Sequence, residues 1–281
     1  MTGPHSIAPP DDQAASAPTL CERPIALEKD VLRRRIYAPL AYAPVRNAAV
    51  VPIVHSECLM LASWFPMVWR RRQAAAVEFV VVRALLNDQR AQPPAARALL
   101  PLLLHAYPFV FDPDQPVGTD TRKMLDDVFA DAPTDVGASI TTVNRKPARA
   151  TASRFQILDR FANESVVTTA IGNALADLDL LEPWPLKFDI DGHHVEIPDL
   201  MVIRPSAFDS GALAGLLEAW GMPCAQMLGL HRISLFRAGV LLAAAKAFLK
   251  HNPVIIPGEG GEPAEQPRAA AADTQMPSTP S

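Results

Sequence analysis

The chain of 281 residues contains few cysteines. Cys21, Cys58 and Cys224 are an odd number without a Cys-x-x-Cys pair, which argues against a disulfide framework and against a thiolate zinc site. We expect a reducing compartment, with Cys58 and Cys224 as small buried apolar residues rather than nucleophiles.

A long apolar segment is also missing. The most apolar late stretch, residues 234–250, contains Arg237 and Lys246, whereas a membrane-spanning helix needs about 20 apolar residues. This stretch is predicted as a buried or amphipathic helix, with a helix lying on a membrane surface as the alternative. The first residues have neither a basic start nor an apolar run, so no secretory signal is expected. The sequence therefore predicts a cytoplasmic protein without a transmembrane segment, with leaderless export as the alternative.

Neither sign of charge dominates. The formal net charge is −4, of which residues 1–24 carry −2 and residues 253–281 carry −3, so the chain between them is close to neutral at +1. General nucleic-acid binding needs a concentrated basic face and is therefore not expected. The arginine triplets 33–35 and 70–72 are predicted to be solvated, because neighbouring residues of a strand point to opposite faces.

Familiar catalytic signatures are absent as well. The sequence has no G-x-S-x-G, G-x-G-x-x-G or G-x-x-x-x-G-K-[ST] segment, so a nucleophile elbow and a nucleotide-phosphate loop are unsupported. No catalytic residue and no cofactor are predicted.

Proline, by contrast, is abundant. Of the 28 prolines, 11 lie in residues 1–24 and 253–281, which are also acidic and rich in small residues. These two segments are predicted to be disordered tails. Residues 25–252 are long enough to bury a core and are predicted to form a single domain.

Between the tails, the pattern predicts an α+β fold, in which a mainly antiparallel sheet is packed by a long helix and a C-terminal helix pair. The sheet is expected to include hairpins over residues 67–82 and 186–203. Apolar residues recur with the 3.6-residue period of a helix from residue 152 to about 179. The helix pair is expected over residues 209–220 and 224–248, with a bend at Gly239.

Two short helices and one flexible loop are expected in the middle of the chain. The helices are predicted before Pro108, with Pro101 either beginning or kinking the first one, and over residues 120–130. Proline, threonine and glycine are frequent in residues 131–149, which are expected to form the loop.

A cluster of possible metal ligands lies within residues 188–197. It comprises Asp189, Asp191, His193, His194 and Glu196. The Asp191-Gly192 turn signal places Asp189 opposite His194 and Lys187 opposite Glu196, and it directs the two histidines to opposite faces. Lys187 would repel a cation beside Glu196. A structural hairpin is therefore predicted, and no metal site.

The segment His55-Ser56-Glu57 follows a predicted strand over residues 49–54. Ser56 is expected to cap a short helix, with Leu59, Met60, Trp64 and Phe65 on its apolar face. Adjacent polar residues do not by themselves make a catalytic relay, because a nucleophile and its base need a defined geometry. A ligand pocket at this strand end is the functional alternative. Its candidate ligand-binding residues are His55, Glu57, Trp64 and His105.

Taken in order, several segments resemble the SapC family, which is named for a protein associated with a bacterial surface layer. The resemblance is carried by Tyr37-Ala38-Pro39-Leu40, Val51-Pro52-Ile53-Val54-His55-Ser56-Glu57, Trp64-Phe65-Pro66-Met67-Val68, residues 78–86, Tyr107-Pro108-Phe109, Leu180-Leu181-Glu182-Pro183, the Asp191-Gly192 hairpin and residues 225–233. The chain departs from the family pattern in residues 87–104, where a Pro/Ala-rich stretch replaces an acidic-aromatic turn, and in residues 112–150.

The resemblance implies a role linked to the bacterial cell envelope or surface layer, without an established reaction. We therefore expect a non-catalytic accessory or binding protein that acts through a protein partner or a small ligand. The alternative is an enzyme, or an accessory subunit of one, with a small-ligand pocket near His55, Glu57 and Trp64.

Overall fold

The computed structural model describes residues 20–72, 76–190, 193–209 and 211–252. The tails predicted for residues 1–24 and 253–281 lie almost wholly outside these ranges, as does the Asp191-Gly192 turn. Near the N-terminal boundary, the backbone N–H groups of Glu22 and Arg23 donate to the carboxylate of Asp126. The expected domain boundary at residue 24 therefore falls at the start of a strand that is already held in place.

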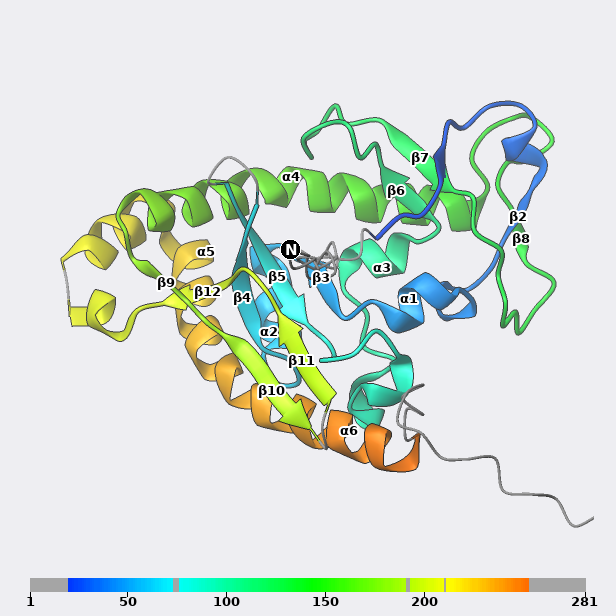
Figure 1. Cartoon of the computed structure of the whole chain (residues 1–281). Helices are drawn as coiled ribbons and strands as arrows, with labels where there is room; N and C mark the ends of the chain where they lie inside the picture. The colour runs from blue at the N-terminus through cyan, green and yellow to red at the C-terminus, as the bar shows by residue number, and fades with distance from the viewer. Residues whose placement is uncertain (1–19, 73–75, 191–192, 210, 253–281) are drawn as a thin grey trace, which may run out of the picture.

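A five-stranded antiparallel sheet lies at the centre of the fold (Figure 1). In spatial order its strands are β3 (Val50–Pro52), β5 (Val77–Val82), β4 (Met67–Arg71), β12 (Leu200–Ile203) and β9 (Leu181–Pro183). The predicted β4–β5 hairpin is confirmed, with Trp69 opposite Phe79. All residues of β5 except Glu78 are buried, as expected for an inner strand that is apolar on both faces.

The second predicted hairpin joins β10 (Leu186–Ile190) to β11 (His193–Ile197). Its predicted register is confirmed, since Asp189 pairs with His194 and Lys187 with Glu196. The hairpin forms a separate two-stranded sheet, and only β12 from the 186–203 segment joins the central sheet.

A three-stranded sheet stands beside the central one. Its strands are β1 (Pro24–Ile25), β7 (Lys123–Asp126) and β6 (Phe109–Phe111). The helix predicted for residues 120–130 is therefore wrong. Hydrogen bonding to β1 on one side and β6 on the other makes residues 123–126 a strand, and Phe129 beyond it is 88% exposed.

The long helix is α4 (Arg149–Asp177), which confirms the predicted helix. Its early buried positions follow the predicted period, including Leu158 and Phe161. Farther along, Val166 is exposed, whereas Ser165 and Thr168 are buried. The helix turns small polar residues inward there, a face that an apolar period does not reveal.

The C-terminal helices are α5 (Ala212–Ser234) and α6 (Ala238–His251), joined by the 3₁₀ helix η8 (Leu235–Arg237). The helical path of α5 breaks at Gly221, whose φ of 55° suits a glycine. No break falls at Gly239, where a bend was expected, because the interruption of the α-helix lies at Leu235–Arg237 and Gly239 is inside α6. With the antiparallel sheets and α4, these helices confirm the α+β class.

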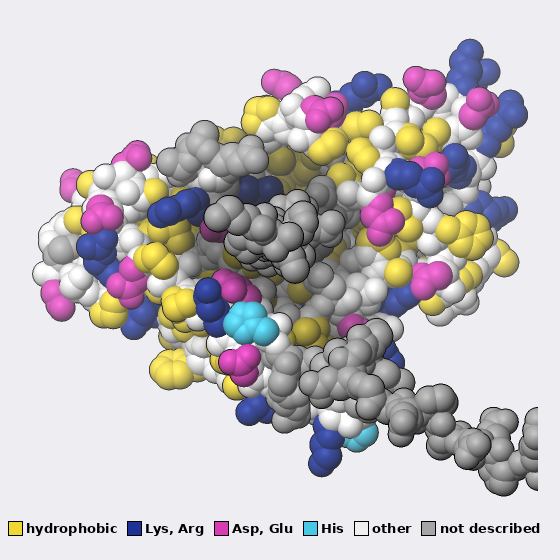
Figure 2. Space-filling model, in the orientation of Figure 1, with side chains coloured by type: hydrophobic (Ala, Val, Ile, Leu, Met, Phe, Trp, Pro, Cys, Tyr) yellow, Lys and Arg dark blue, Asp and Glu magenta, His cyan; other side chains and the backbone are white. Residues whose placement is uncertain are grey.

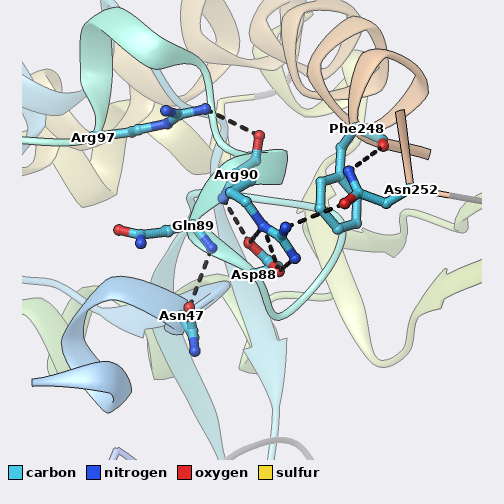
Figure 3. A network of polar contacts seen from close by, with 7 residues as sticks. All are labelled: Asn47, Asp88, Gln89, Arg90, Arg97, Phe248 and Asn252. Atoms are coloured by element: carbon cyan, nitrogen blue, oxygen red, sulfur yellow. Dashed lines mark hydrogen bonds and ion pairs between the residues drawn. The ribbon is translucent and has the colours of Figure 1, made fainter. Parts of the chain in front are cut away.

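Arg90 fastens α6 to the rest of the fold (Figure 3). Its guanidinium binds Asp88, donates 3.1 Å to Asn252 Oδ1 and lies 4.9 Å from the ring centre of Phe248. Arg90 belongs to the 3₁₀ helix η5 (Gln89–Ala91), within the stretch that departs from the family pattern. This divergent stretch therefore provides contacts that hold α6.

Shorter elements complete the chain. They are α1 (Ala43–Asn47), α2 (Cys58–Leu61), α3 (Leu102–Ala106), the strand pair β2 (Arg35–Ile36) and β8 (Ala138–Ser139), and the 3₁₀ helices η1 (Val31–Arg33), η2 (Pro39–Ala41), η3 (His55–Glu57), η6 (Pro94–Ala96) and η7 (Pro205–Asp209). Pro101 precedes α3 as its N-cap and so begins that helix rather than kinking it. Among the helices described, none is long and apolar enough to cross a membrane.

Candidate ligand-binding cavity

A cavity of about 500 Å³ lies between the edge of β5, α3, β6 and α4. In Figure 2, hydrophobic side chains are visible in a shaded recess beside the grey atoms near the centre of the view. Its apolar wall includes Val50, Ile53, Phe79, Leu104, Phe109 and Phe161. The volume falls within the range typical of small-molecule sites.

The cavity runs along an open edge of the central sheet. Pairing between β3 and β5 ends at Pro52 and Val80, with one further bond from the N–H of Ile53 to the carbonyl of Phe79. The odd-numbered residues of β5 direct their backbone groups toward the β3 side, so those of Val77 point past the end of β3. Within the described residues, the N–H and C=O of Val77 have no hydrogen-bond partner. The cavity wall thus offers backbone polar groups beside apolar side chains.

Three charged residues of the β4–β5 hairpin form a cluster in the wall. Arg70 Nη2 donates to Glu78 Oε2 at 2.6 Å, and Arg72 binds both carboxylate oxygens of Glu78, at 3.0 and 2.8 Å. Two guanidinium groups therefore share one carboxylate.

Arg70 is buried, unlike the other arginines of its triplet. Its side chain is 9% exposed, against 54% for Arg72. The solvated position predicted for residues 70–72 is thus wrong for Arg70, because its side chain folds against Glu78 of the neighbouring strand and is buried, whereas residues 33–35 are exposed as predicted. Arg70 Nε is buried without a hydrogen-bond partner. Among the described contacts, Nη1 has none either.

Two of the three hydroxyl residues that α4 contributes to the wall are satisfied by their own helix. Ser165 Oγ donates 2.8 Å to the carbonyl of Ala162, and Thr168 Oγ1 donates 2.9 Å to the carbonyl of Glu164. These hydroxyls make this side of the cavity only weakly polar.

The N-terminal segment closes one side of the cavity, to which Leu20 and Cys21 contribute. Asp126 holds this segment and also accepts a 2.7 Å hydrogen bond from the hydroxyl of Tyr107, another wall residue. Burial, followed by the nearby Asp126 carboxylate, raises the pKa of the Cys21 thiol. The thiol is therefore held in its protonated, weakly nucleophilic form at neutral pH.

None of the four candidate residues chosen from the sequence lines this cavity. His55 lies directly behind the wall, where its Nδ1 is 3.1 Å from Thr168 Oγ1 and its backbone N–H donates to the same oxygen. Burial lowers the pKa of His55. His105 and Trp64 are exposed, the latter by 39%.

Glu57 is the most perturbed of the four. It is 3% exposed, and its carboxylate accepts from the N–H of Val54 at 2.9 Å and from the N–H of Leu102 at 2.7 Å. Burial raises the pKa of Glu57 to about 7, against the opposing effect of these two donors. Glu57 thereby fastens the start of α3 to η3, just behind two wall residues, Leu103 and Leu104.

The helix cap expected from Ser56 is wrong. Glu57 accepts the free N–H of Val54, while the Ser56 hydroxyl donates to Glu164 on α4. The apolar face predicted for the following helix is also mostly wrong. Of its four residues only Phe65 is buried. The buried residues of α2 are instead Cys58 and Leu61, so the helix faces the core with a different side.

The charges of the β10–β11 hairpin are surface ion pairs. Lys187 Nζ lies 2.7 Å from Glu196 Oε1, and His194 lies between Asp189 and Glu196 at 3.3 and 3.6 Å. In the described part of the chain, no group of three or more potential ligands is placed to hold a metal ion. The side chain of His193 and the whole of Asp191 lie outside that part.

These features define an α+β protein with an apolar cavity at an open sheet edge and a buried arginine in its wall. The profile of the SapC family matches residues 33–217, so the chain belongs to the SapC family. The match spans the whole central sheet, α4 and the cavity apart from Leu20 and Cys21, and it ends within α5. Comparisons with curated proteins and with solved structures gave no match.

Proposed function

We propose that this SapC-family protein is a non-catalytic binding protein that holds one small, mainly apolar ligand in the cavity between β5, α3, β6 and α4. The observation that carries the proposal is the cavity itself, of about 500 Å³ with walls that are predominantly apolar. Sites of this kind use a few polar groups to orient a ligand that is otherwise buried by apolar contacts. The open edge at Val77 and the Arg70 cluster are such groups.

The chemistry of the wall supports binding rather than catalysis. Cys21 is the wall's thiol, and its pKa is raised by burial, which disfavours the reactive thiolate. The Tyr107 hydroxyl is committed to Asp126, and the pKa of Tyr107 is raised by burial and by that carboxylate. Neither group is prepared for nucleophilic attack at neutral pH.

Family membership supports a role linked to the cell envelope or surface layer, and the sequence supports a cytoplasmic location. Cell fractionation of the native host tests the location. Recovery of full-length protein in the cytoplasmic fraction is expected, and recovery mainly outside the cytoplasm would contradict it.

The binding proposal is tested with the neutral fluorescent probe N-phenylnaphthylamine and the full-length protein. A saturable rise in fluorescence with one probe per chain is expected. Val110 lies in β6 and lines the cavity, so Val110→Trp should fill part of the space and weaken probe binding at least about tenfold. Val240→Trp on α6 adds the same bulk away from the cavity and should bind like the wild type. Equal binding by all three proteins would refute the proposal.

The enzyme alternative has one observation in its favour, the pKa of about 7 for Glu57, which suits a general acid or base. Glu57 is, however, separated from the cavity by the residues it fastens. We therefore expect Glu57→Gln to bind the probe as the wild type does, provided that it is folded. Turnover of a bound compound that is lost specifically in Glu57→Gln would favour the enzyme.

A further inference from the structure

We infer that the cavity is built for an acidic amphiphile, a molecule with an apolar body and one small anionic head, and that Arg70 and Arg72 receive the head. This inference rests on the proposed binding function and names the chemical class of its ligand.

The charged cluster in the wall is positive on balance. Arg70 and Arg72 both bind Glu78, so the cluster carries one positive charge beyond what its single carboxylate neutralises. A buried charge without a full counter-charge is costly, and an anion placed beside it removes that cost. Among the described residues of the wall, one other is charged, Asp112, whose carboxylate accepts from Asp114 N and Gln115 Nε2 in its own turn.

Arg70 also has hydrogen-bond donors that the described part of the protein does not use. Glu78 takes one bond from Arg70, through Nη2, while Nε and Nη1 have no partner among the described residues. Arg72 gives both of its bonding nitrogens to Glu78. A guanidinium presents its donors as a planar fork that matches the two oxygens of a carboxylate or a phosphate. Arg70 therefore has binding capacity that the protein does not use.

The rest of the wall contrasts with this charged cluster. Away from the charged residues, aromatic and aliphatic side chains dominate, with Phe109, Phe111 and Phe161 from β6 and α4. A ligand that is polar throughout would desolvate its polar groups against these rings without compensation. A ligand that is apolar throughout would leave the free donors of Arg70 and the second positive charge of the cluster unmatched. An amphiphile with one acidic end satisfies both parts.

The test measures displacement of N-phenylnaphthylamine from the full-length protein by four ligands that share one alkyl chain: dodecanoate, dodecyl phosphate, dodecanol and dodecylamine. At least one of the two acids should displace the probe at a concentration about tenfold below that of dodecanol, because hydrogen bonds to a charged partner are worth that much. Dodecylamine should be the weakest. The two acids together identify whether the head is a carboxylate or a phosphate.

Three variants locate the effect. Arg70→Gln should bring the preferred acid to the level of dodecanol, while Glu78→Gln, which frees both arginines, should strengthen its binding severalfold. Arg71→Gln makes the same charge change on the same strand, but Arg71 does not line the cavity, so its preference for acids should match that of the wild type. If Arg70→Gln does not fold, Arg72→Gln, whose side chain is mostly exposed, supplies the charge loss instead.

The outcomes separate the two proposals. If the probe does not bind, the proposed binding function fails, and the acidic ligand fails with it. If the probe binds but neither acid is preferred over dodecanol, or if Arg71→Gln lowers the preference as much as Arg70→Gln, the cavity stands and the acidic ligand is refuted.

Discussion

The β4–β5 and β10–β11 hairpins carry the same kind of charged pair in different surroundings. Arg70 lies directly opposite Glu78 in one, and Lys187 lies directly opposite Glu196 in the other. The exposed fractions of these side chains are 9% and 24% in the first pair, against 54% and 36% in the second. The strand register therefore determines which two side chains pair, whereas the rest of the fold decides whether the pair lies in a cavity wall or in water.

The two hairpins also differ in how their apolar faces are packed. On the face of β4 opposite to Arg70, Trp69 packs 4.9 Å from Phe79 and 4.8 Å from His231 of α5, measured between ring centres, and α4 passes close to it at Gly172. The β10–β11 hairpin packs one face against the core through Leu186 and Ile190, while its charged face remains open. Four experiments test this comparison between the two hairpins and the elements around them.

Removing the central aromatic of each hairpin should give very unequal losses. Trp69→Ala removes a fully buried ring and should lower the free energy of unfolding by about 3–5 kcal/mol. Phe188→Ala removes a partly buried ring from β10 and should cost about 1 kcal/mol. Urea denaturation of both variants measures the difference. Similar losses would mean that the two hairpins are equally part of the core.

The pH dependence of stability should differ between the buried and the exposed histidine. His231 donates 2.6 Å to the carbonyl of Met67 and accepts from the N–H of Ile203, and burial lowers its pKa from 6.5 to about 4. Its contribution is complete above pH 6.5 and is lost as the pH falls through 4. Glu57, with its pKa raised from 4.5 to about 7, contributes fully below pH 4.5 and loses this contribution as the pH rises through 7.

The two slopes oppose each other between pH 4.5 and 6.5 and should largely cancel in the wild type. His231→Gln should therefore lose stability as the pH rises toward 7, and Glu57→Gln should lose it as the pH falls toward 4, by about 2–3 kcal/mol across each window. His194→Gln on the exposed hairpin should follow the wild type. Denaturation midpoints across this pH range measure the slopes, and parallel curves for all four proteins would contradict the assignment.

Neutralising the shared carboxylate should separate the two charged pairs. Glu78→Gln leaves Arg70 buried without a counter-charge and should cost about 2 kcal/mol. Glu196→Gln removes an exposed partner and should leave the stability unchanged within error. The comparison is made at low and at high salt. A larger loss for Glu196→Gln would show that the exposed pair is the more important one.

The smallest effect concerns the helix that covers β4 and β5. An added Cβ at Gly172 would lie 3.2 Å from Trp69 Nε1 and 3.2 Å from Val77 Cγ2. We expect Gly172→Ala to destabilise by about 1 kcal/mol despite its better helix propensity, because both neighbours are tightly packed. Gly215→Ala on α5 meets nothing within 4 Å and should stabilise by about 0.5–1 kcal/mol. Stabilisation by both substitutions would mean that α4 is not closely packed on the sheet.

Local pattern was sufficient for the elements that depend on neighbouring residues. The Asp191-Gly192 turn signal predicted the register of β10 and β11, because a two-residue turn allows only one pairing of the two strands. The period of α4 predicted its length because a helix hydrogen-bonds within itself. Local pattern failed for β7, where pairing with β6 and with β1, which lies about a hundred residues earlier in the chain, overrides a helical spacing.

The candidate residues chosen from the sequence include two that lie next to the cavity and none that lines it. His55 and Glu57 lie directly behind the cavity, and their backbone and carboxylate bonds hold two elements beside it. Arg70 was expected in water, because nothing in an arginine triplet tells which residue will be covered. His105 and Trp64 proved to be exposed, since an apolar run does not state which side of a short helix meets the core.

By itself, then, the sequence determined the α+β class, the two hairpins, the long helix and the membership of the SapC family, because these depend on turn chemistry, periodicity and the order of short motifs. The tertiary structure decided where pairing of β3 stops, which arginine is buried and which walls enclose the cavity. Those outcomes depend on contacts between residues that are distant along the chain, so no local pattern encodes them.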